Sequence, residues 1–341
     1  MLNPKAKLSE KIFKKDIEEK ATKEGWGEGL VAVGEANEGV IVISADTAGS
    51  VRNSLFKDKF PERFVQVGVA EQAMATIAAG MANYGKIPFI ATYAMFSPGR
   101  NWEQIRTTIA LNNLPVKIGG GHSGLSDGPD GATHQALEDI AIMRAMPNII
   151  VIVPCDAVET KKAVVEAAKN GKPTYIRFAR EVTPVFTTGD TPFEIGKAEI
   201  FWDSVSPTTN HQPLITNRVA IVGCGPLVYE ALFAAKELEG SGIETVVINC
   251  HTIKPIDEET IISVAKKCGA VVTVEEHQVT GGLGGAAAEV LARSYPTPME
   301  FIGMPNSFGE SGEPDELLEK YGMKAKHIIE AVKKVIKRKE I

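Results

Sequence analysis

The stretch FVQVGVAEQAMATIAAGMANYGKIPFIATYAMF, residues 64–96, decides the fold that this sequence predicts. Its first part, FVQVGV, alternates apolar residues and so favours a strand. Apolar side chains then recur at helical spacing, at Met74, Ile77, Ala78 and Met81. The last part, IPFIATYAM, is apolar nearly throughout, which is typical of a strand buried on both faces. A strand, a helix and a second buried strand in succession predict a parallel α/β sheet.

Glu71 interrupts the apolar face of the predicted helix. It lies in the first turn, before Met74. The helix dipole favours a carboxylate there, but burying one without a partner costs free energy. Periodicity alone allows two interpretations. In the more frequent case the side chain turns out to solvent, and in the other Glu71 is a buried acid whose partner is a proton-bearing group.

The composition is that of a globular protein long enough for two domains. The chain has 341 residues, of which 44% are hydrophobic and 23% are charged. Its formal net charge is -6 and it shows no basic stripe, so we expect neither a nucleic acid nor an anionic membrane as a partner.

Signals for export or membrane insertion are not apparent. No apolar run reaches the length of a membrane span, and the charged residues 1–20 lack the apolar centre of a signal peptide. The four cysteines show no CxxC spacing, which favours reduced thiols. We therefore expect a cytoplasmic protein.

Strands and helices alternate along residues 1–188, which predicts a doubly wound domain with a mostly parallel sheet. Its first elements are expected to be one or two helices within residues 8–36. Pro, Thr, Asp and Asn dominate residues 189–217, although EIGKAEIFW within them fits a strand, and we expect this segment to connect two domains. Residues 218–341 again alternate strands and helices and predict a second doubly wound domain.

Polar residues follow the predicted strands at their carboxyl ends, where parallel sheets bind ligands. Asp46 ends the strand GVIVISAD, and a glycine-rich loop from His122 to His134 follows LPVKIGGG. The two histidines lack the spacing of a zinc site and suit hydrogen bonding or proton transfer beside a polar ligand. Arg180, at the end of TYIRFAR, can hold an anion such as a sugar phosphate, although pairing with a surface carboxylate fits the spacing equally well.

Two glycine-rich motifs in the second domain do not indicate a nucleotide. The motif at Gly223 and Gly225 lacks a third glycine. GGLGG, residues 281–285, lacks the lysine of a phosphate-binding loop, and close backbone packing explains it better. Glu276 and His277 before it can belong to a site edge or an interface, and a lone histidine there is more often structural.

Six segments, taken together, resemble the C-terminal half of transketolase: FPERFVQVGVAEQAMATIAAGMA, IPFIATYAMF, DGPDGATHQALEDIAIMR, TYIRFAR, EEHQVTGGLGGAAAEVL and SFGESGEPDELLEKYG. They occur in the family's order, and the resemblance extends from about residue 20 to about residue 325. It implies a pyrimidine-binding domain followed by the family's C-terminal domain. The implied activity is transfer of a two-carbon ketol unit from a ketose phosphate to an aldose phosphate.

The resemblance implies thiamine diphosphate as the cofactor and gives Glu71 a role. The family's acid at this position hydrogen-bonds N1′ of the pyrimidine and promotes the imino tautomer, whose nitrogen removes the proton from the thiazolium C2. Such a pyrimidine is the proton-bearing partner that a buried Glu71 needs. Tyr93 and Phe96 match aromatic residues that line the pyrimidine, and Asp46 matches an acid near the thiazolium.

The resemblance also implies contacts with the sugar substrates for Ser50, His122, Asp130, His134 and Arg180. Both histidines are expected to be catalytic, and His134 is expected to hydrogen-bond the substrate hydroxyls or carbonyl oxygen. Arg180 is expected to hold the substrate phosphate, with Ser50 beside it. Lys23 aligns only loosely with a family arginine, whose bidentate contact a lysine cannot make.

The family's G-D-G motif, which binds Mg²⁺ and the cofactor diphosphate together with a later Asn, is absent from the sequence. That motif belongs to the N-terminal pyrophosphate domain, and the family's site lies between this domain and another protomer's pyrimidine domain. The resemblance therefore implies half a site, completed by a separate pyrophosphate-domain subunit in an α2β2 assembly with a large apolar interface. We expect that subunit to ligate the Mg²⁺ or Ca²⁺, and we expect no metal ligands in this chain.

Two related enzymes share the implied architecture: 1-deoxyxylulose-5-phosphate synthase and the β subunit of 2-oxo acid dehydrogenases. The β subunits are separate chains, but HQALEDIAIMR and FGESG are closer to transketolase. The synthase is the closer rival because its substrates carry phosphate. A regulatory or scaffold subunit is the alternative outside enzymes, and the joint presence of Glu71, His122, His134 and Arg180 argues against it.

Overall fold

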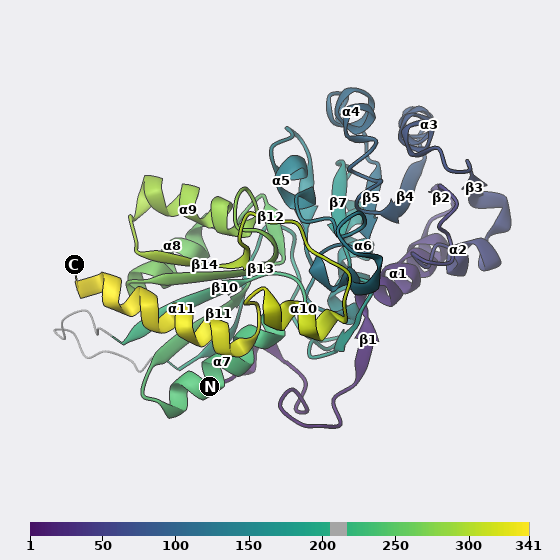
Figure 1. Cartoon of the computed structure of the whole chain (residues 1–341). Coiled ribbons are helices and arrows are strands. Elements are labelled where there is room, and N and C mark those ends of the chain that lie inside the picture. The colour runs from purple at the N-terminus through teal and green to yellow at the C-terminus, as the bar shows by residue number, and fades with distance from the viewer. Residues whose placement is uncertain (205–216, 341) are drawn as a thin grey trace.

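Two α/β units lie side by side in the computed structural model, which describes residues 1–204 and 217–340 (Figure 1). Of the segment expected to connect the domains, residues 189–217, the part from 205 to 216 lies outside the described residues. Within the described ranges, no helix has both the length and the apolar character needed to cross a membrane.

The first unit is built on a seven-stranded sheet with the strand order β12-β6-β7-β5-β4-β2-β3. Neighbouring strands are parallel except for the pair of β12 with β6. The strands are β2 (Val40–Ser44), β3 (Phe64–Gln66), β4 (Ile87–Tyr93), β5 (Lys117–Gly121), β6 (Ile150–Ile152), β7 (Thr174–Arg177) and β12 (Thr252–Lys254). A two-stranded ribbon pairs β1 (Glu19–Ala21) with β8 (Val182–Pro184).

Helices cover both faces of this sheet because its strands are apolar on both sides. In β2, Val40 and Val42 pack in the core beneath α1 and α6, while Ile41 and Ile43 pack in the core beneath α3. The helices are α1 (Thr22–Ala36), α2 (Ser54–Lys59), α3 (Glu71–Asn83), α4 (Trp102–Gln104), α5 (Asp139–Arg144) and α6 (Ala157–Lys169). A π-helical segment, Ile105–Ala110, continues α4.

The second unit has a five-stranded sheet with the order β14-β13-β10-β11-β9. Its strands are β9 (Glu199–Asp203), β10 (Arg218–Gly223), β11 (Glu244–Asn249), β13 (Val271–Gln278) and β14 (Met299–Met304). Within this sheet, as far as its strands are described, only the edge pair of β9 with β11 is antiparallel. The helices are α7 (Val228–Gly240), α8 (Glu258–Cys268), α9 (Leu283–Ser294), α10 (Pro314–Lys320) and α11 (Ala325–Lys337).

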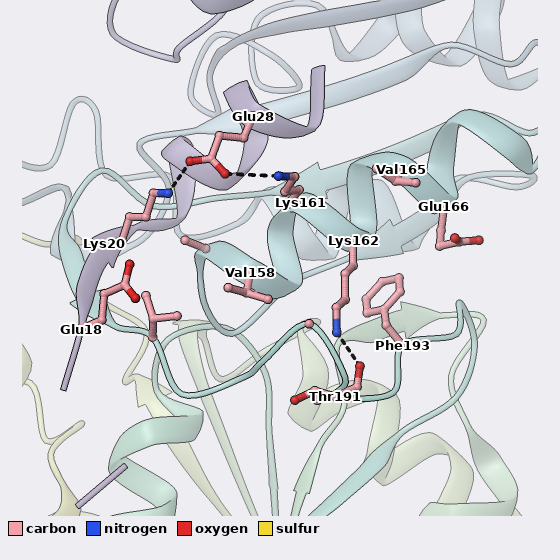
Figure 2. Close-up of a pocket in the computed structure, with 13 residues that line it drawn as sticks. Glu18, Lys20, Glu28, Val158, Lys161, Lys162, Val165, Glu166, Thr191 and Phe193 are labelled. Atoms are coloured by element: carbon pink, nitrogen blue, oxygen red, sulfur yellow. Dashed lines mark hydrogen bonds and ion pairs between the residues drawn. The ribbon is translucent and has the colours of Figure 1, made fainter. Parts of the chain in front are cut away.

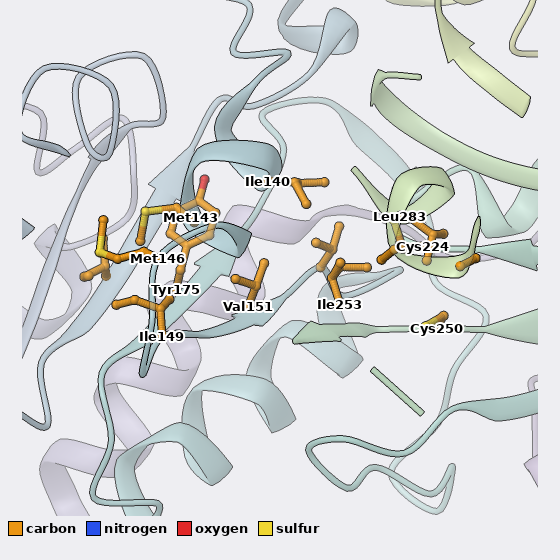
Figure 3. Close-up of a cluster of buried hydrophobic side chains, with 14 of the residues drawn as sticks. Ile140, Met143, Met146, Ile149, Val151, Tyr175, Cys224, Cys250, Ile253 and Leu283 are labelled. Atoms are coloured by element: carbon orange, nitrogen blue, oxygen red, sulfur yellow. The ribbon is translucent and has the colours of Figure 1, made fainter. Parts of the chain in front are cut away.

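The two units share a core. One cluster of buried side chains extends from Met143 and Tyr175 of the first unit to Cys224, Cys250 and Leu283 of the second (Figure 3). The strand β12, which follows β11 in the sequence, completes the edge of the first sheet. The units are therefore joined by a strand and by apolar packing as well as by the chain.

One helix, α1, forms within residues 8–36, where one or two were expected. Residues 1–17 lie against the second unit. The amide of Asn3 donates to the carbonyl of Phe201 at 2.9 Å, and Ile12 is buried in the core around α7. Burial of Ile12 against a distant part of the chain is a tertiary contact that local periodicity does not reveal.

The stretch 64–96 forms the expected strand, helix and strand, with two differences. β3 ends at Gln66, because Gly68 has a φ of 70° and the chain turns away from the sheet before Val69. The helix α3 buries Met74 and Ala78 but leaves Ile77 at 37% exposure, so its buried face is rotated towards its alanines.

Candidate active site at the carboxyl edge of the first sheet

The candidate site residues converge because of the strand order. The strands β2, β4, β5 and β7 are neighbours and parallel, so their carboxyl ends lie along one edge of the sheet. Asp46, Tyr93, His122 and Arg180 each follow or end one of these strands, and Glu71 begins the helix after β3 on the same edge. Ligands of parallel sheets bind at such an edge.

An aromatic cluster forms the centre of this edge. The Tyr93 and His122 rings stack with centroids 3.9 Å apart and an interplanar angle of 7°. Phe96 stacks on Tyr93 at 5.8 Å, and His134 lies edge-on to Phe96 at 5.5 Å and to Tyr93 at 6.0 Å. Two predicted pyrimidine-lining residues and two predicted catalytic histidines therefore form one group.

His122 is held as a neutral imidazole. Its side chain is buried and its backbone has a φ of 52°, a conformation that non-glycine residues seldom adopt. Burial lowers the pKa of His122 to about 3, and the positive charges of Lys23 and Arg180 act in the same direction. The Nδ1 atom has no hydrogen-bond partner among the described residues, so it is available to a ligand.

Glu71 is buried, with 2% of its surface exposed, so the interpretation in which it turns out to solvent is wrong. Its Oε2 atom accepts a hydrogen bond from Nη1 of Arg100 at 2.9 Å. The side-chain amide of Asn101 donates to the Glu71 backbone carbonyl at 3.0 Å and fixes the start of α3. The Arg100 guanidinium also lies over the Phe96 ring, with Cζ 4.7 Å from the centroid.

Arg100 was not among the site residues predicted from the sequence. Its position in the sequence could have identified it. Arg100 follows the end of β4, on the same edge as Glu71, in the turn that contains Ser97 and Pro98. What could not be read from the sequence is that this turn points the guanidinium at Glu71.

A second, charged cluster lies around Arg180. Its Nη1 atom is 3.2 Å from Oδ1 of Asp130 and 3.9 Å from Oδ1 of Asp127. Asp127 is fully buried, and neither carboxylate oxygen has a hydrogen-bond partner among the described residues. Burial raises the pKa of Asp127 to about 7, with Asp130 and Glu276 adding to the effect and Arg180 and Lys23 opposing it.

Lys23 and Asp127 thus join the cluster that Asp130 and Arg180 form. Burial lowers the pKa of Lys23, and nearby Arg52 and Arg180 act in the same direction. Lys23 had only a loose alignment to support it, and nothing in the loop from residue 122 to 134 distinguished Asp127 from Asp130.

Asp46 and Ser50 lie on the loop after β2, and both are exposed. The Asp46 amide donates to Oε1 of Gln66 at 2.9 Å, and the Thr47 hydroxyl donates to that of Thr92 at 3.0 Å, which ties the loop to the end of β4. The structure therefore places these two residues at the rim of the cluster, not in its buried centre.

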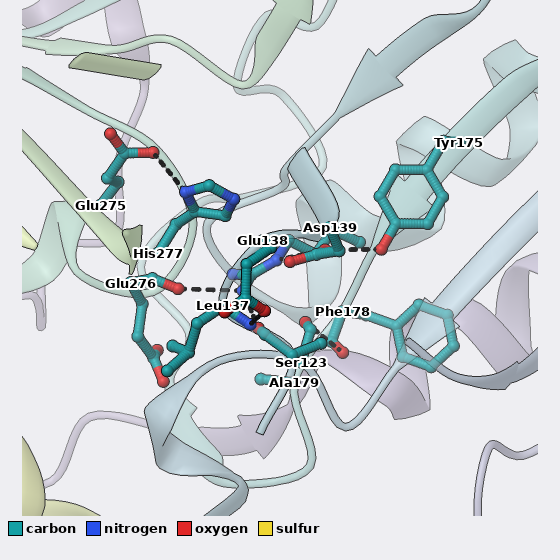
Figure 4. A network of polar contacts seen from close by, with 12 residues as sticks. Ser123, Leu137, Glu138, Asp139, Tyr175, Phe178, Ala179, Glu275, Glu276 and His277 are labelled. Atoms are coloured by element: carbon teal, nitrogen blue, oxygen red, sulfur yellow. Dashed lines mark hydrogen bonds and ion pairs between the residues drawn. The ribbon is translucent and has the colours of Figure 1, made fainter. Parts of the chain in front are cut away.

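Buried contacts at the interface of the two units support the loop that carries the histidines (Figure 4). Nε of Arg177 donates to Asp139 at 2.8 Å, and the Tyr175 hydroxyl donates to the same oxygen at 2.6 Å. Nη2 of Arg177 donates to the carbonyls of Ala136 and Glu276. The Glu276 carboxylate accepts from the amide of Ser126, inside the loop. This network anchors both ends of the loop to the second unit.

A cavity of about 620 Å³ lies elsewhere, between α1, α6 and the segment from Val185 to Phe193 (Figure 2). Its lysines already have partners, because Lys20 and Lys161 pair with Glu28 and Lys162 donates to backbone carbonyls. No residue of the aromatic cluster lines this cavity. The candidate site therefore stays at the carboxyl edge of the first sheet. Among the residues that the structure describes, no group of three or more His, Cys, Asp or Glu side chains is arranged to hold a metal ion.

Comparison with known families defines the class of protein. The family model described as transketolase, pyrimidine binding domain, matches residues 18–185, and that described as transketolase, C-terminal domain, matches residues 213–328. The chain belongs to the transketolase family. The expected α/β fold with two mostly parallel sheets is confirmed.

Individual relatives match nearly the whole chain. The putative transketolase C-terminal section of Methanocaldococcus jannaschii is 42% identical over 92% of this chain and 97% of its own length. A 6-deoxy-6-sulfo-D-fructose transketolase subunit of a Clostridium species is 35% identical over 96% of this chain and 98% of its own length. Transketolase-like protein 2 of Mus musculus is 38% identical, and the matched part spans 49% of it.

Solved structures agree with these matches. A split gene transketolase, described as an inactive beta4 tetramer, superposes with a TM-score of 0.84 at 42% identity, over 94% of this chain and 99% of that one. The transketolase of Campylobacter jejuni gives a TM-score of 0.77 over 95% of this chain and 50% of its own, and at 24% identity it shows a shared fold.

Proposed function

We propose that this chain is the pyrimidine-binding half of a two-subunit transketolase, which transfers a two-carbon ketol unit from a ketose phosphate to an aldose phosphate. The observation that carries the proposal is the convergence, at one open sheet edge, of a buried acid, an aromatic cluster and two histidines. Glu71, Tyr93, Phe96, His122 and His134 come from separate parts of the sequence and meet there.

The residues at this edge fit an aminopyrimidine. Glu71 and the Phe96 ring together already hold a planar cation, the guanidinium of Arg100. An acid paired with an aromatic face is what a protonated aminopyrimidine requires. When bound, thiamine diphosphate supplies the carbon nucleophile that carries the two-carbon unit. Glu71 would hold the proton at N1′ of the pyrimidine, and Tyr93 and Phe96 would orient the ring.

The remaining site residues would position the sugars. The neutral His122 presents an unpaired Nδ1 to a substrate hydroxyl, and His134 lies beside the same rings, where it can exchange a proton with the substrate oxygen. Arg180 would hold the terminal anion, with Ser50 at the rim and Asp130 next to a sugar hydroxyl. Asp46 would face the thiazolium side.

The half-site needs a second subunit. Three large apolar side chains are exposed along α3: Val69 beside Glu71 at 71%, Ile77 within the helix at 37% and Tyr84 at its far end at 91%. The relatives described as a C-terminal section and as a split gene transketolase support division of the enzyme between two chains. We propose an α2β2 assembly in which the pyrophosphate-domain subunit ligates Mg²⁺ or Ca²⁺ and the cofactor diphosphate. All four cysteines are buried free thiols, which suits the reducing cytoplasm that we propose as its location.

One observation favours a second substrate class, sugars that end in a sulfonate. Asp130 and Asp127 lie 3.2 Å and 3.9 Å from the Arg180 guanidinium, and a carboxylate there repels a dianionic phosphate more than a monoanionic sulfonate. The relative named for 6-deoxy-6-sulfo-D-fructose is 35% identical. A sulfonated ketose is therefore the alternative donor.

Reconstitution with the pyrophosphate-domain subunit tests the function. The two subunits are co-expressed and supplied with thiamine diphosphate, Mg²⁺, xylulose 5-phosphate and ribose 5-phosphate, and two-carbon transfer is measured for the mixture and for each subunit alone. The proposal expects transfer by the mixture only. Parallel assays replace the donor with 6-deoxy-6-sulfofructose or pyruvate. Pyruvate decarboxylation without ketol transfer contradicts the proposal and favours the synthase or dehydrogenase alternatives.

A further inference from the structure

Arg100 makes two contacts that the proposed cofactor ring would need, one with Glu71 and one with Phe96. It sits in a tight turn after β4, in which its amide donates to the carbonyl of Phe96 at 3.1 Å. The turn folds the side chain back, so that Nη1 reaches Oε2 of Glu71 at 2.9 Å and Cζ lies 4.7 Å from the centroid of the Phe96 ring. The guanidinium therefore uses one carboxylate oxygen and one aromatic face at the same time.

The two side chains of the Glu71–Arg100 ion pair differ in how deeply they are buried. The side chain of Glu71 is 3% exposed, whereas that of Arg100 is 49% exposed. A buried carboxylate without a partner costs free energy, but a half-exposed arginine finds water as an alternative partner. Glu71 thus depends on Arg100 much more than Arg100 depends on Glu71, and Arg100 is the member of the pair that can leave.

A guanidinium and a protonated aminopyrimidine have the same recognition chemistry. Both are flat cations that donate hydrogen bonds to a carboxylate in their plane and stack on an aromatic face. One oxygen of Glu71 and one face of Phe96 cannot serve both at full contact. The two groups therefore compete for the same contacts.

We propose that Arg100 is a placeholder for the cofactor pyrimidine: it holds Glu71 while the site lacks thiamine diphosphate, and the pyrimidine displaces it on binding. This inference rests on the proposed function and adds a positioning residue to it. The isolated chain keeps its buried acid paired, so it can fold before its partner delivers the cofactor. The cost is weaker cofactor binding, because the Glu71 to Arg100 contact must break first.

A double-mutant cycle in the isolated chain tests the ion pair. Urea unfolding is compared for wild type, Arg100→Met, Glu71→Gln and the double variant, with Arg106→Met as the control for loss of an exposed arginine on the adjoining π-helical segment. Arg100→Met should destabilise the chain when Glu71 is present and have little effect when residue 71 is glutamine. Equal effects in both backgrounds overturn the proposal, because Glu71 then does not depend on Arg100.

Cofactor affinity in the assembled complex tests displacement. Thiamine diphosphate with Mg²⁺ is titrated calorimetrically into complexes that carry wild-type, Arg100→Met or Arg106→Met chains. Because removing the placeholder removes the competing contact, Arg100→Met should bind thiamine diphosphate more tightly, by about three- to tenfold. Arg106→Met should match wild type.

The outcomes separate the inference from the function on which it rests. Unchanged or weaker binding by the Arg100→Met complex, with measurable binding by wild type, overturns the inference alone, since Arg100 would then support the bound cofactor or play no part. A wild-type complex that binds no thiamine diphosphate overturns both the inference and the proposed function.

Discussion

The carboxyl edges of the two sheets have the same topology and opposite environments. In the first sheet the edge carries half-exposed or exposed groups, among them Asp46, Arg100 and Arg180. In the second sheet, β11 and β13 end in polar residues that are almost completely buried, including His251, Glu275 and His277. The second edge packs against the first unit, where the amide of Ala141 donates to His277, whereas the first edge keeps Asp46 and Ser50 exposed to solvent.

The difference shows what each edge does with its polar groups. At the second edge Glu275 and His277 find partners within the chain, although Nε2 of His251 and Oδ1 of Asn249 have none among the described residues. Glu275 accepts hydrogen bonds from the amides of Leu283 and Gly284 at the start of α9, and His277 accepts from the amide of Ala141. At the first edge, Asp127 and Nδ1 of His122 have no such partner among the described residues. Glu275 and His277 thus serve packing at the covered edge, and we infer that Asp127 and His122 serve a ligand at the first edge, where exposed groups surround them.

Removing the acid from the open edge should have the largest effect. We expect Glu71→Ala to lower two-carbon transfer by the assembled enzyme by about 10³-fold, because proton transfer by a positioned side chain contributes on the order of 10² to 10⁴. The measurement is the initial transfer rate at saturating thiamine diphosphate. Glu330→Gln, an exposed position on α11, is the control. An active Glu71→Ala enzyme contradicts the role of Glu71.

Removing an ion pair from the covered edge should lower the free energy of unfolding and not the transfer rate. Arg177→Met leaves Asp139 buried without its ion-pair partner, and such losses cost about 3–5 kcal/mol. Urea unfolding measures the difference, with the exposed Arg106→Met as the control. A loss below about 1 kcal/mol, in the range of a surface pair, would mean that the network does not hold the units together.

A smaller effect on rate is expected from the histidine at the rim of the aromatic cluster. We expect His134→Asn to lower kcat by about 10²-fold, because asparagine keeps a hydrogen-bonding group but cannot transfer a proton. Unfolding free energy should change little, since His134 is only partly buried. If KM rises and kcat is unchanged, His134 binds the substrate without acting on a proton.

The last prediction concerns the pH dependence of stability, which Asp127, the buried acid of the first edge, should control. The pKa of Asp127 is about 7 in the folded chain against an ordinary value of 3.8, so the folded state binds more protons than the unfolded state between these values. Stability is therefore lost as pH rises through this window. Asp127→Asn removes the titration and should be more stable than wild type at pH 8, with a gap that closes towards pH 4. Unfolding at several pH values measures it, and a gap that does not vary with pH contradicts it.

The sequence predicted those elements that depend on local pattern. The apolar run of β2 and the helix α6 follow from hydrophobicity and spacing. The helical pattern singled out Glu71 and the glycine-rich loop singled out His122 and His134, whereas the family resemblance gave them roles and added Tyr93 and Phe96. The strand order of the first sheet then brings these residues to one edge.

Contacts between segments that are distant in the chain could not be predicted from the sequence. Ile12 packs into the core of the second unit, and β12 joins the first sheet, because long-range packing decides both. Arg100 was missed because its role depends on the direction of a turn. Asp127 was missed because only burial distinguishes it from Asp130 in the same loop.

The central claim is that the open edge is half of a catalytic site, in which Glu71 triggers the cofactor only when the second subunit is present. The most direct test is exchange of the thiazolium C2 proton of thiamine diphosphate for deuterium, followed by NMR after rapid acid quench. We predict fast exchange in the mixture of subunits, exchange at the rate of free thiamine diphosphate with either subunit alone, and slow exchange in a mixture that carries Glu71→Gln. Equally fast exchange in the wild-type and Glu71→Gln mixtures would contradict the claim.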